Sequence, residues 1–260
     1  MRRRGIRIFI VIVLLCLVAM FSVRNVYGFM RMSNLLLETD VFTIADYIIG
    51  IFNSAQFVMY FIIPVSFSIL VSDLMRSDFD ESIARFILIR NQNRNVYLIE
   101  KCKMIMTLAI LYTFVMIMIA VIVALVFRVS LVGENHHYLF LAFNGNVLRV
   151  FIMVISTFIL GLFFIGVVVL ALSIYTKSAG IAVGIIILIG FAHNIFYVIG
   201  AHTTLAWLPF SQYMIGHYNA FSPFGLDVPY FNGLFANLYM ITGSGLFLGV
   251  IMYKLKKMEI

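Results

Sequence analysis

Six predominantly apolar segments of 18 to 25 residues divide this 260-residue chain, and they limit what it can fold into. A helix that crosses the hydrocarbon core of a bilayer needs about 20 such residues. The segments of sufficient length are Ile6–Val23, Tyr47–Val71, Met104–Phe127, Val150–Ile174, Gly180–Gly200 and Leu234–Tyr253. Charged residues make up only 11% of the chain, whereas soluble domains carry about 25%. We therefore predict an all-α integral membrane protein with six transmembrane helices, in which residues 1–260 form a single transmembrane domain.

The first apolar segment follows the basic sequence MRRRGIR, and the same combination occurs in signal peptides. No small-x-small cleavage site follows it, and the residues before Cys16 are too bulky for a lipoprotein signal. We expect an uncleaved first membrane helix. Cys16 and Cys102 are expected to be free thiols, because a disulfide framework needs spaced cysteines in an oxidising compartment.

The lysines and arginines between the apolar segments are distributed unevenly. Counted over alternate loops, fourteen lie on one side of the predicted membrane and four on the other. The larger set comprises Arg2, Arg3, Arg4, Arg7, Arg76, Arg85, Arg90, Arg94, Lys101, Lys103, Lys177, Lys254, Lys256 and Lys257. Because cytoplasmic loops carry the excess of Lys and Arg, both termini are predicted to be cytoplasmic. The expected location is the cell membrane, and the net charge of +7 requires no nucleic-acid partner.

The predicted cytoplasmic segment 72–103 holds eleven of the 29 charged residues in the chain (18 basic and 11 acidic). Apolar residues recur at helical spacing between Phe79 and Arg90, whereas Asp80 and Glu81 are turned largely elsewhere. This pattern predicts a short amphipathic helix along the membrane surface, followed by a break at RNQNRN. Such a helix either lies on the surface without a partner or acts as a lever whose polar face meets a cytoplasmic protein.

The predicted outer segment 201–233 holds the only tryptophan and three of the four prolines of the chain. Aromatic side chains with polar ends settle at the membrane interface. The segment is therefore either a plain anchoring loop or a short re-entrant element.

Ionisable side chains are missing from the middle of the predicted spans, except for one histidine. Ion-coupled transporters and proton pumps need such groups inside the bilayer, so these classes are not favoured. His193, next to Asn194, is either a packing and hydrogen-bonding residue or a relay. Asn53 and Gln56 precede Pro64, which should kink the second span because it lacks an N–H. These amides either line a substrate path or bond to a neighbouring helix.

Motifs for chemistry within the membrane are weak. Ser244, in a Gly-Ser-Gly sequence, faintly resembles an intramembrane serine protease, but no histidine follows it to act as a base. His136 and His137 are adjacent in an outer loop and would not share a helix face. We expect no enzymatic activity from this chain.

Two pairs of glycines four residues apart occur in the last two spans, Gly180 with Gly184 and Gly245 with Gly249. Small residues at this spacing allow membrane helices to approach closely. We expect them to serve packing within the chain rather than an interface between subunits.

The segment between the second and third spans resembles the coupling helix of ATP-binding-cassette exporter permeases of the type-2 class, which have an ABCG-like, or type V, fold. In that family an acidic residue is followed by Gly-Thr, an apolar run, a Pro or Gly turn and Ser-Arg, with a lysine seven residues later. The positions that match are Asp78, Phe86–Ile89, Arg94 and Lys101.

Two departures and two further similarities accompany this resemblance. Ser82-Ile83 replaces the Gly-Thr pair, and Asn91 stands where Pro or Gly is usual. Leu172–Ile185 is similar to the tight cytoplasmic turn between spans four and five of the family. Trp207–Phe210, with the sequence WLPF, is similar to its outer proline segment before span six.

The resemblance implies two permeases, identical or related, driven by two ATPase subunits. This chain has no GxxxxGK[ST] loop, so it would bind no cofactor, and ATP with Mg²⁺ would be held by the nucleotide-binding partner. The residues expected to contact that partner are Asp78, Asp80, Glu81, Arg85, Arg90, Arg94, Lys101 and Lys177. The residues expected near the substrate path, which spans two and five border in this family, are Asn53, Gln56, Pro64, His193 and Asn194.

These features favour the permease subunit of a bacterial ATP-driven exporter for a hydrophobic or amphipathic cargo, such as a peptide, an antibiotic or other drug, or a lipid-like molecule. The alternative from another class is a membrane scaffold or sensor whose cytoplasmic helix docks a signalling partner. An intramembrane enzyme comes third. Co-purification of an ATPase distinguishes the first two.

Overall fold

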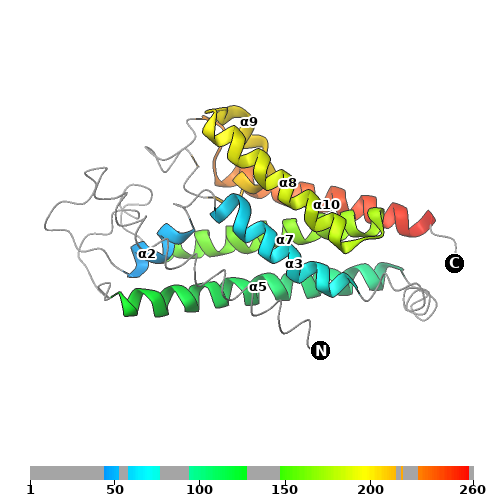
Figure 1. The fold of residues 1–260 in the computed structure, drawn as a ribbon, viewed down its shortest axis with the longest axis horizontal. Coiled ribbons are helices and arrows are strands. Elements are labelled where there is room, and N and C mark those ends of the chain that lie inside the picture. Colours follow the sequence, from blue (N-terminus) through cyan, green and yellow to red (C-terminus); the bar gives the residue numbers. More distant parts are fainter. Residues whose placement is uncertain are drawn as a thin grey trace, which may run out of the picture.

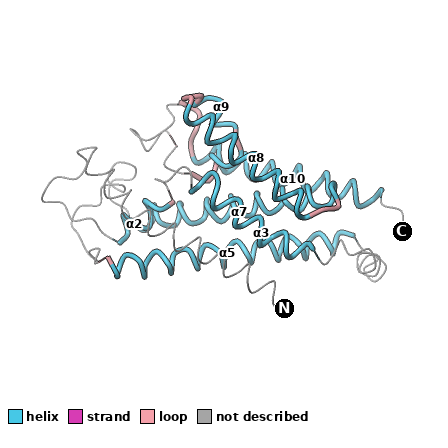
Figure 2. The backbone as a smooth tube through the Cα atoms, in the orientation of Figure 1, coloured by secondary structure: helices cyan, strands magenta, loops and turns pink. Residues whose placement is uncertain are grey.

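The computed structural model describes residues 44–52, 58–76, 94–127, 147–214, 218 and 228–257. Helices make up nearly all of these ranges, and no strand occurs within them (Figure 1, Figure 2). The elements are α2 (Ile44–Ile51), the π-helical η1 (Val58–Ile62), α3 (Ile63–Arg76), α5 (Arg94–Val126), α7 (Val147–Thr176), α8 (Ala179–Val198), α9 (His202–Trp207), the 3-10 turn η2 (Pro209–Ser211) and α10 (Gly233–Lys257). The all-α prediction is confirmed for this part of the chain.

Four of the helices, α5, α7, α8 and α10, are long and apolar enough to cross a membrane. The shortest has 20 residues, which at 1.5 Å per residue gives about 30 Å, the thickness of the hydrocarbon core. They correspond to the third to sixth predicted spans. Their outward faces carry large apolar side chains, such as Leu188 at 68% exposed, as expected where lipid is the solvent. The first predicted span, Ile6–Val23, lies outside the described residues.

The second predicted span, Tyr47–Val71, is not one regular helix. α2 ends at Ile51, and the next described element is the π turn η1, which leads directly into α3 at Ile63. The π turn lies just before Pro64, where the missing N–H disturbs the ladder of helical hydrogen bonds. The helix disturbance that we predicted at Pro64 is therefore a π turn rather than a simple kink. The apolar helical stretch Val58–Leu74 is also shorter than the four spans.

The centre of the packing is α7, which contacts α3, α5, α8 and α10 (Figure 1). Glycines allow the closest approaches. A Cβ added to Gly166 of α7 would overlap the side chain of Ile105 on α5. A Cβ added to Gly243 of α10 would lie 2.8 Å from the ring of Phe164 on α7. Both contacts would be lost with any larger residue.

The two glycine pairs make no close contact with the other described helices. Around a Cβ added to Gly184, Gly245 or Gly249, no atom of another described element lies within 4 Å. At Gly180 the nearest described side-chain atom is Oγ of Ser178, the N-cap of the same helix, at 3.8 Å. A spacing of four puts two glycines on one helix face, but tertiary packing decides whether that face meets a neighbour.

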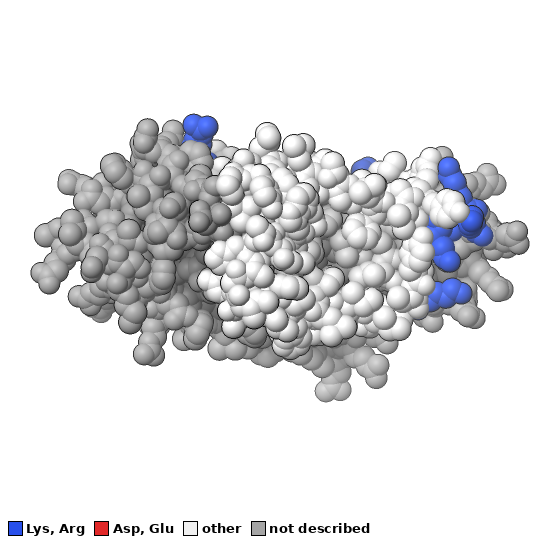
Figure 3. Space-filling view, turned by 90° about the horizontal axis from the view of Figure 1, so that it is seen from above, with Lys and Arg blue, Asp and Glu red and all other residues white. Residues whose placement is uncertain are grey.

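The described helices alternate in direction, so α3, α7 and α10 end where α5 and α8 begin (Figure 1). Nine lysines and arginines lie in these ranges, and only Arg149 belongs to the opposite end. The other eight are Arg76, Arg94, Lys101, Lys103, Lys177, Lys254, Lys256 and Lys257. Figure 3 shows basic side chains gathered at the end where α10 finishes. We call this the basic end.

Candidate functional site

The described part of residues 201–233, the predicted outer segment, is packed against the helices. α8 is followed by a turn at Gly200, where φ is 70°, a conformation that glycine adopts without strain. The short helix α9 and the turn η2, which begins at Pro209, come next. The buried apolar side chains between residues 201 and 214 are Leu205, Ala206, Phe210, Tyr213 and Met214. The segment therefore contains a packed element rather than a plain loop.

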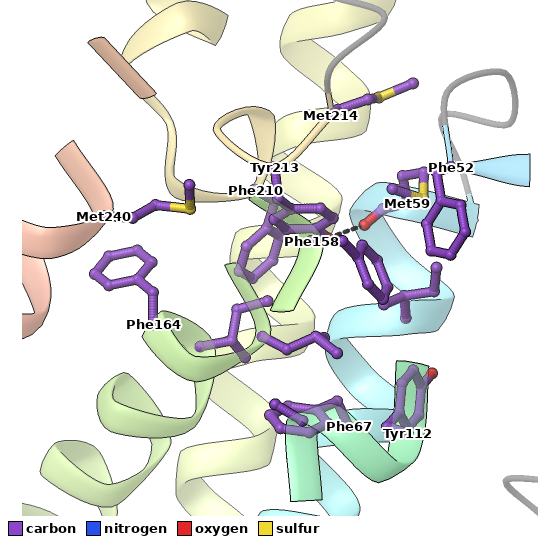
Figure 4. Packing of buried hydrophobic residues seen from close by; sticks show 14 of the residues in the cluster. Phe52, Met59, Phe67, Tyr112, Phe158, Phe164, Phe210, Tyr213, Met214 and Met240 are labelled. Carbon is purple, nitrogen blue, oxygen red and sulfur yellow. Dashed lines mark hydrogen bonds between the residues drawn. The ribbon is translucent and has the colours of Figure 1, made fainter. Parts of the chain in front are cut away.

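One tyrosine joins this segment to the π turn before α3. In a π turn, the carbonyl of Met59 would accept from the N–H five residues later, but Pro64 has none. The Tyr213 hydroxyl donates a hydrogen bond to the Met59 carbonyl (Figure 4). Burial raises the pKa of Tyr213 well above its ordinary value, so the hydroxyl keeps the proton that it donates. Gly161 of α7 leaves room for the tyrosine, because an added Cβ would lie 2.7 Å from Cγ of Tyr213.

His193 on α8 also holds the outer segment. Its Nε2 accepts a hydrogen bond from the Phe210 N–H at 2.9 Å, and its Nδ1 lies 2.8 Å from the Ile189 carbonyl oxygen. Because Nε2 accepts, Nδ1 carries the proton and donates, which assigns the neutral tautomer. The ring stacks on Phe210, with centroids 4.7 Å apart, and lies 5.2 Å from the Tyr60 ring. Backbone groups thus engage both nitrogens, as expected for a packing and hydrogen-bonding residue.

α8 approaches the π turn most closely at Gly190. A Cβ added there would lie 2.8 Å from the carbonyl oxygen of Tyr60. Asn194 donates from Nδ2 to the Gly190 carbonyl at 2.9 Å, a bond within α8 itself. The elements that carry Pro64 and His193, which were both assigned to a substrate path, are therefore in direct contact.

Met59, Pro64, His193, Phe210 and Tyr213 form one buried group, which we call the outer latch. Its polar atoms are paired with backbone groups, and its side chains come from three separate parts of the chain. In the part of the chain that the structure describes, no three residues among His, Cys, Asp and Glu lie close enough to hold a metal ion. These hydrogen bonds and ring contacts hold the outer segment against the start of α3.

Aromatic side chains lie beside the outer latch, near the start of α10. Trp207 donates from Nε1 to the Tyr230 hydroxyl at 3.0 Å, and the Tyr239 hydroxyl donates to the Trp207 carbonyl at 3.0 Å. Phe235 packs edge-on against Trp207, with centroids 5.1 Å apart. Trp207 remains 56% exposed. Amphipathic rings in this arrangement suit the boundary between lipid and water.

The helices that flank the predicted coupling helix meet at the basic end. α3 ends at Arg76, and α5 begins at Arg94. Lys101 is only 8% exposed, and its ammonium lies 3.5 Å from the Leu74 carbonyl oxygen and 5.5 Å from the centre of the Tyr97 ring. Lys101 therefore connects α5 to the last turn of α3 within this chain.

The predicted tight turn between the fourth and fifth spans is confirmed, since only two residues separate α7 from α8. Lys177 is exposed there, with φ of 54°, the left-handed conformation that few non-glycine residues adopt. Ser178 follows as the N-cap of α8, and its Oγ accepts from the Ile181 N–H at 3.4 Å.

The remaining predicted site residues lie outside the described residues. They are Asn53, Gln56, Asp78, Asp80, Glu81, Arg85 and Arg90. Conversely, sequence reasoning missed Tyr213 and Met59. Pro64 signals an unpaired carbonyl one helical turn earlier, but nothing in the local sequence identifies a hydroxyl 154 residues away as its partner.

A protein family matches nearly the whole length of this chain. No curated protein and no solved structure matches it. Residues 8–260 match the family described as "Protein of unknown function (DUF2705)". The chain therefore belongs to the DUF2705 family.

Proposed function

We propose that this chain is the membrane-spanning permease subunit of an ATP-driven exporter of the ATP-binding-cassette type. A hydrophobic or amphipathic substrate leaves the cell, and a separate nucleotide-binding subunit with ATP and Mg²⁺ supplies the energy. The observation that carries the proposal is that α3 ends and α5 begins at the basic end. Residues 77–93, which join these helices, hold five charged residues: Asp78, Asp80, Glu81, Arg85 and Arg90.

In this proposal the basic end faces the cytoplasm. Eight of the nine described lysines and arginines belong to it, and cytoplasmic ends of membrane helices carry this bias. The protein then lies in the cell membrane with its C-terminal helix ending inside, and the charged segment 77–93 is available to a cytoplasmic ATPase.

Side-chain contacts link α3 to α5 at two levels. Lys101 connects their basic ends through the Leu74 carbonyl. Further along, Ser66 Oγ and the Tyr112 hydroxyl are 2.7 Å apart and hydrogen-bonded. Phe67 packs edge-on against the same tyrosine, with centroids 5.5 Å apart. A displacement of the segment between the two helices would therefore reach both of them.

The far end of α3 leads to the outer latch. α3 has 14 residues, so about 21 Å separate its basic end from the π turn. The π turn is a weak point of the helix, because its hydrogen bonding is irregular. Closure of the ATPase would push α3 towards this point and change how Tyr213 and His193 hold the outer segment. His193 would act by positioning, since backbone groups engage both of its nitrogens.

The proposed assembly contains a second permease, identical or related, and two ATPase subunits. Such a permease pair would enclose the substrate path between the subunits. The apolar surroundings of the outer latch favour a cargo with little charge.

Charge reversal tests the coupling. The variants are Asp80→Lys combined with Glu81→Lys, and Arg94→Glu, each co-expressed with the nucleotide-binding subunit that co-purifies with the wild-type chain. We expect the complex to assemble while substrate-stimulated ATP hydrolysis is lost. Arg149→Glu, at the opposite end of the molecule, is the matched control and should keep coupling. Unchanged coupling in the first two variants would refute the assignment of the segment.

Co-purification tests the proposal as a whole. The full chain is expressed with its genomic neighbours and isolated in mild detergent. We expect an ATPase subunit to co-purify. If only proteins without an ATP-binding motif are retained, the scaffold or sensor alternative replaces the exporter.

A further inference from the structure

Four lysines gather where α7 ends, α8 begins and α10 ends. Lys177 forms the turn, and Lys254, Lys256 and Lys257 occupy the last turn of α10. We call these four the lysine cluster. Figure 3 shows the concentration of basic side chains at this end of the molecule. Among the described residues, no carboxylate forms an ion pair with any of the four.

The helix ends nearby do not neutralise the lysine cluster. Its four side chains carry a charge of +4. The C-termini of α7 and α10 each contribute about −0.5 and the N-terminus of α8 about +0.5. About +3.5 therefore remains at this end of the molecule, which is more than helix capping requires.

Two of the lysines lie against exposed tyrosines. The ammonium of Lys254 is 5.4 Å from the centre of the Tyr175 ring, which is 46% exposed. The ammonium of Lys257 is 4.5 Å from the centre of the Tyr253 ring, which is 58% exposed. A ring face attracts the cation without a hydrogen-bond acceptor, so N–H donors of both lysines can still reach an anion.

The lysine cluster continues into apolar surface. Ile181 in the first turn of α8 and Val250, one turn before Lys254, are both exposed. A ligand that presents an anion beside hydrocarbon fits this arrangement, whereas a soluble anion would leave the apolar part unused. Tyrosines at the same level match the headgroup region of a bilayer.

We propose that the lysine cluster binds the headgroup of an anionic phospholipid, with the phosphodiester between Lys177 and the lysines of α10 and the acyl chains along α8 and α10. The interaction is electrostatic and hydrophobic, and no bond is made or broken. It does not depend on an ATPase partner, so it can hold or fail independently of the exporter proposal.

Lipid retention by the purified full chain tests the inference. The protein in mild detergent is titrated with phosphatidylglycerol or with phosphatidylcholine of the same acyl chains, and native mass spectrometry measures the bound lipid. We expect preferential retention of phosphatidylglycerol, and about fivefold weaker binding for each lysine changed to glutamine at low salt. Lys103→Gln, an exposed cation of α5 at the same end, is the matched control and should bind as the wild type does.

Competition and variant measurements identify the ligand. Glycerol phosphate at millimolar concentration should not displace the lipid, and equal competition by it would overturn the lipid assignment in favour of a soluble anion. Equal retention of both lipids by the wild type, or undiminished phosphatidylglycerol binding by Lys254→Gln and by the Lys256→Gln/Lys257→Gln pair, would also refute it. A loss of ATPase binding without any loss of lipid would show a protein-docking surface instead. Unchanged melting of each variant without added lipid confirms that it is folded.

Discussion

The hydrogen bond from Phe210 to His193 makes a measurable prediction about the outer latch. His193→Phe keeps a ring of similar size in the stack but removes the acceptor. The buried Phe210 N–H would then have no partner, which costs about 1–3 kcal/mol of stability. His193→Ala also loses the aromatic stacking, a further cost of about 0.5–1.5 kcal/mol before any cavity forms.

Trp207 reports this change directly. It is the only tryptophan in the chain, and it ends α9, three residues before Phe210. Thermal unfolding of the detergent-solubilised protein, followed by tryptophan emission, should show a lower midpoint for His193→Phe and a lower one still for His193→Ala. The emission of the folded variants should also shift, since the outer segment is held less firmly.

Asn194→Ala is the matched control on the same helix. Among the described residues, the Asn194 side chain bonds only to the Gly190 carbonyl of its own helix, so its loss should cost about 0.5 kcal/mol or less. The reasoning is refuted if His193→Phe melts and emits like the wild type. It is refuted equally if Asn194→Ala is as destabilising as His193→Phe. The hydrogen bond to the outer segment would then contribute no more stability than a bond within α8.

Two further predictions concern the helix packing. Tyr213→Phe should destabilise the protein by about 1–3 kcal/mol, because the Met59 carbonyl loses its donor. That cost should shrink in a Pro64→Ala background, where residue 64 regains an N–H, and a double-mutant cycle of melting curves would show additivity if the two residues act independently. Gly166→Ala should cost about 1–3 kcal/mol through overpacking against α5, whereas Gly249→Ala should be tolerated or slightly stabilising. Equal effects of the two alanines on the melting temperature would contradict the packing described for α7.

The basic end and the outer latch lie at opposite ends of the same helix, α3. In the proposed exporter this gives α3 two tasks, to receive a displacement through the segment that follows it and to transmit it to the π turn that precedes it. The charge reversals and the His193 variants therefore examine the two ends of one element. If the exporter proposal holds, Tyr213→Phe should alter substrate-stimulated ATP hydrolysis even though the hydroxyl is remote from the basic end.

Much of the fold could be predicted from the amino-acid sequence alone. The third to sixth apolar segments appear as helices of spanning length, and the turn at Lys177 is as short as its sequence indicated. These features depend on the transfer of consecutive side chains from water to lipid and on local backbone chemistry, which neighbouring residues determine. The disturbance at Pro64 was predictable for the same reason, since a missing N–H acts within one helical turn.

Only the tertiary structure determines which side chains form the contacts between helices. Among the described residues, the paired glycines of α8 and α10 contact no other helix, while the unpaired Gly166 meets a side chain of α5. Lys101, which the family resemblance assigned to a contact with the ATPase partner, is buried beside the end of α3. The Met59 carbonyl, which Pro64 cannot pair, accepts a hydrogen bond from Tyr213, far along the chain. Each outcome depends on which helix faces meet after the chain folds, and hydropathy and spacing define a face without identifying its neighbour.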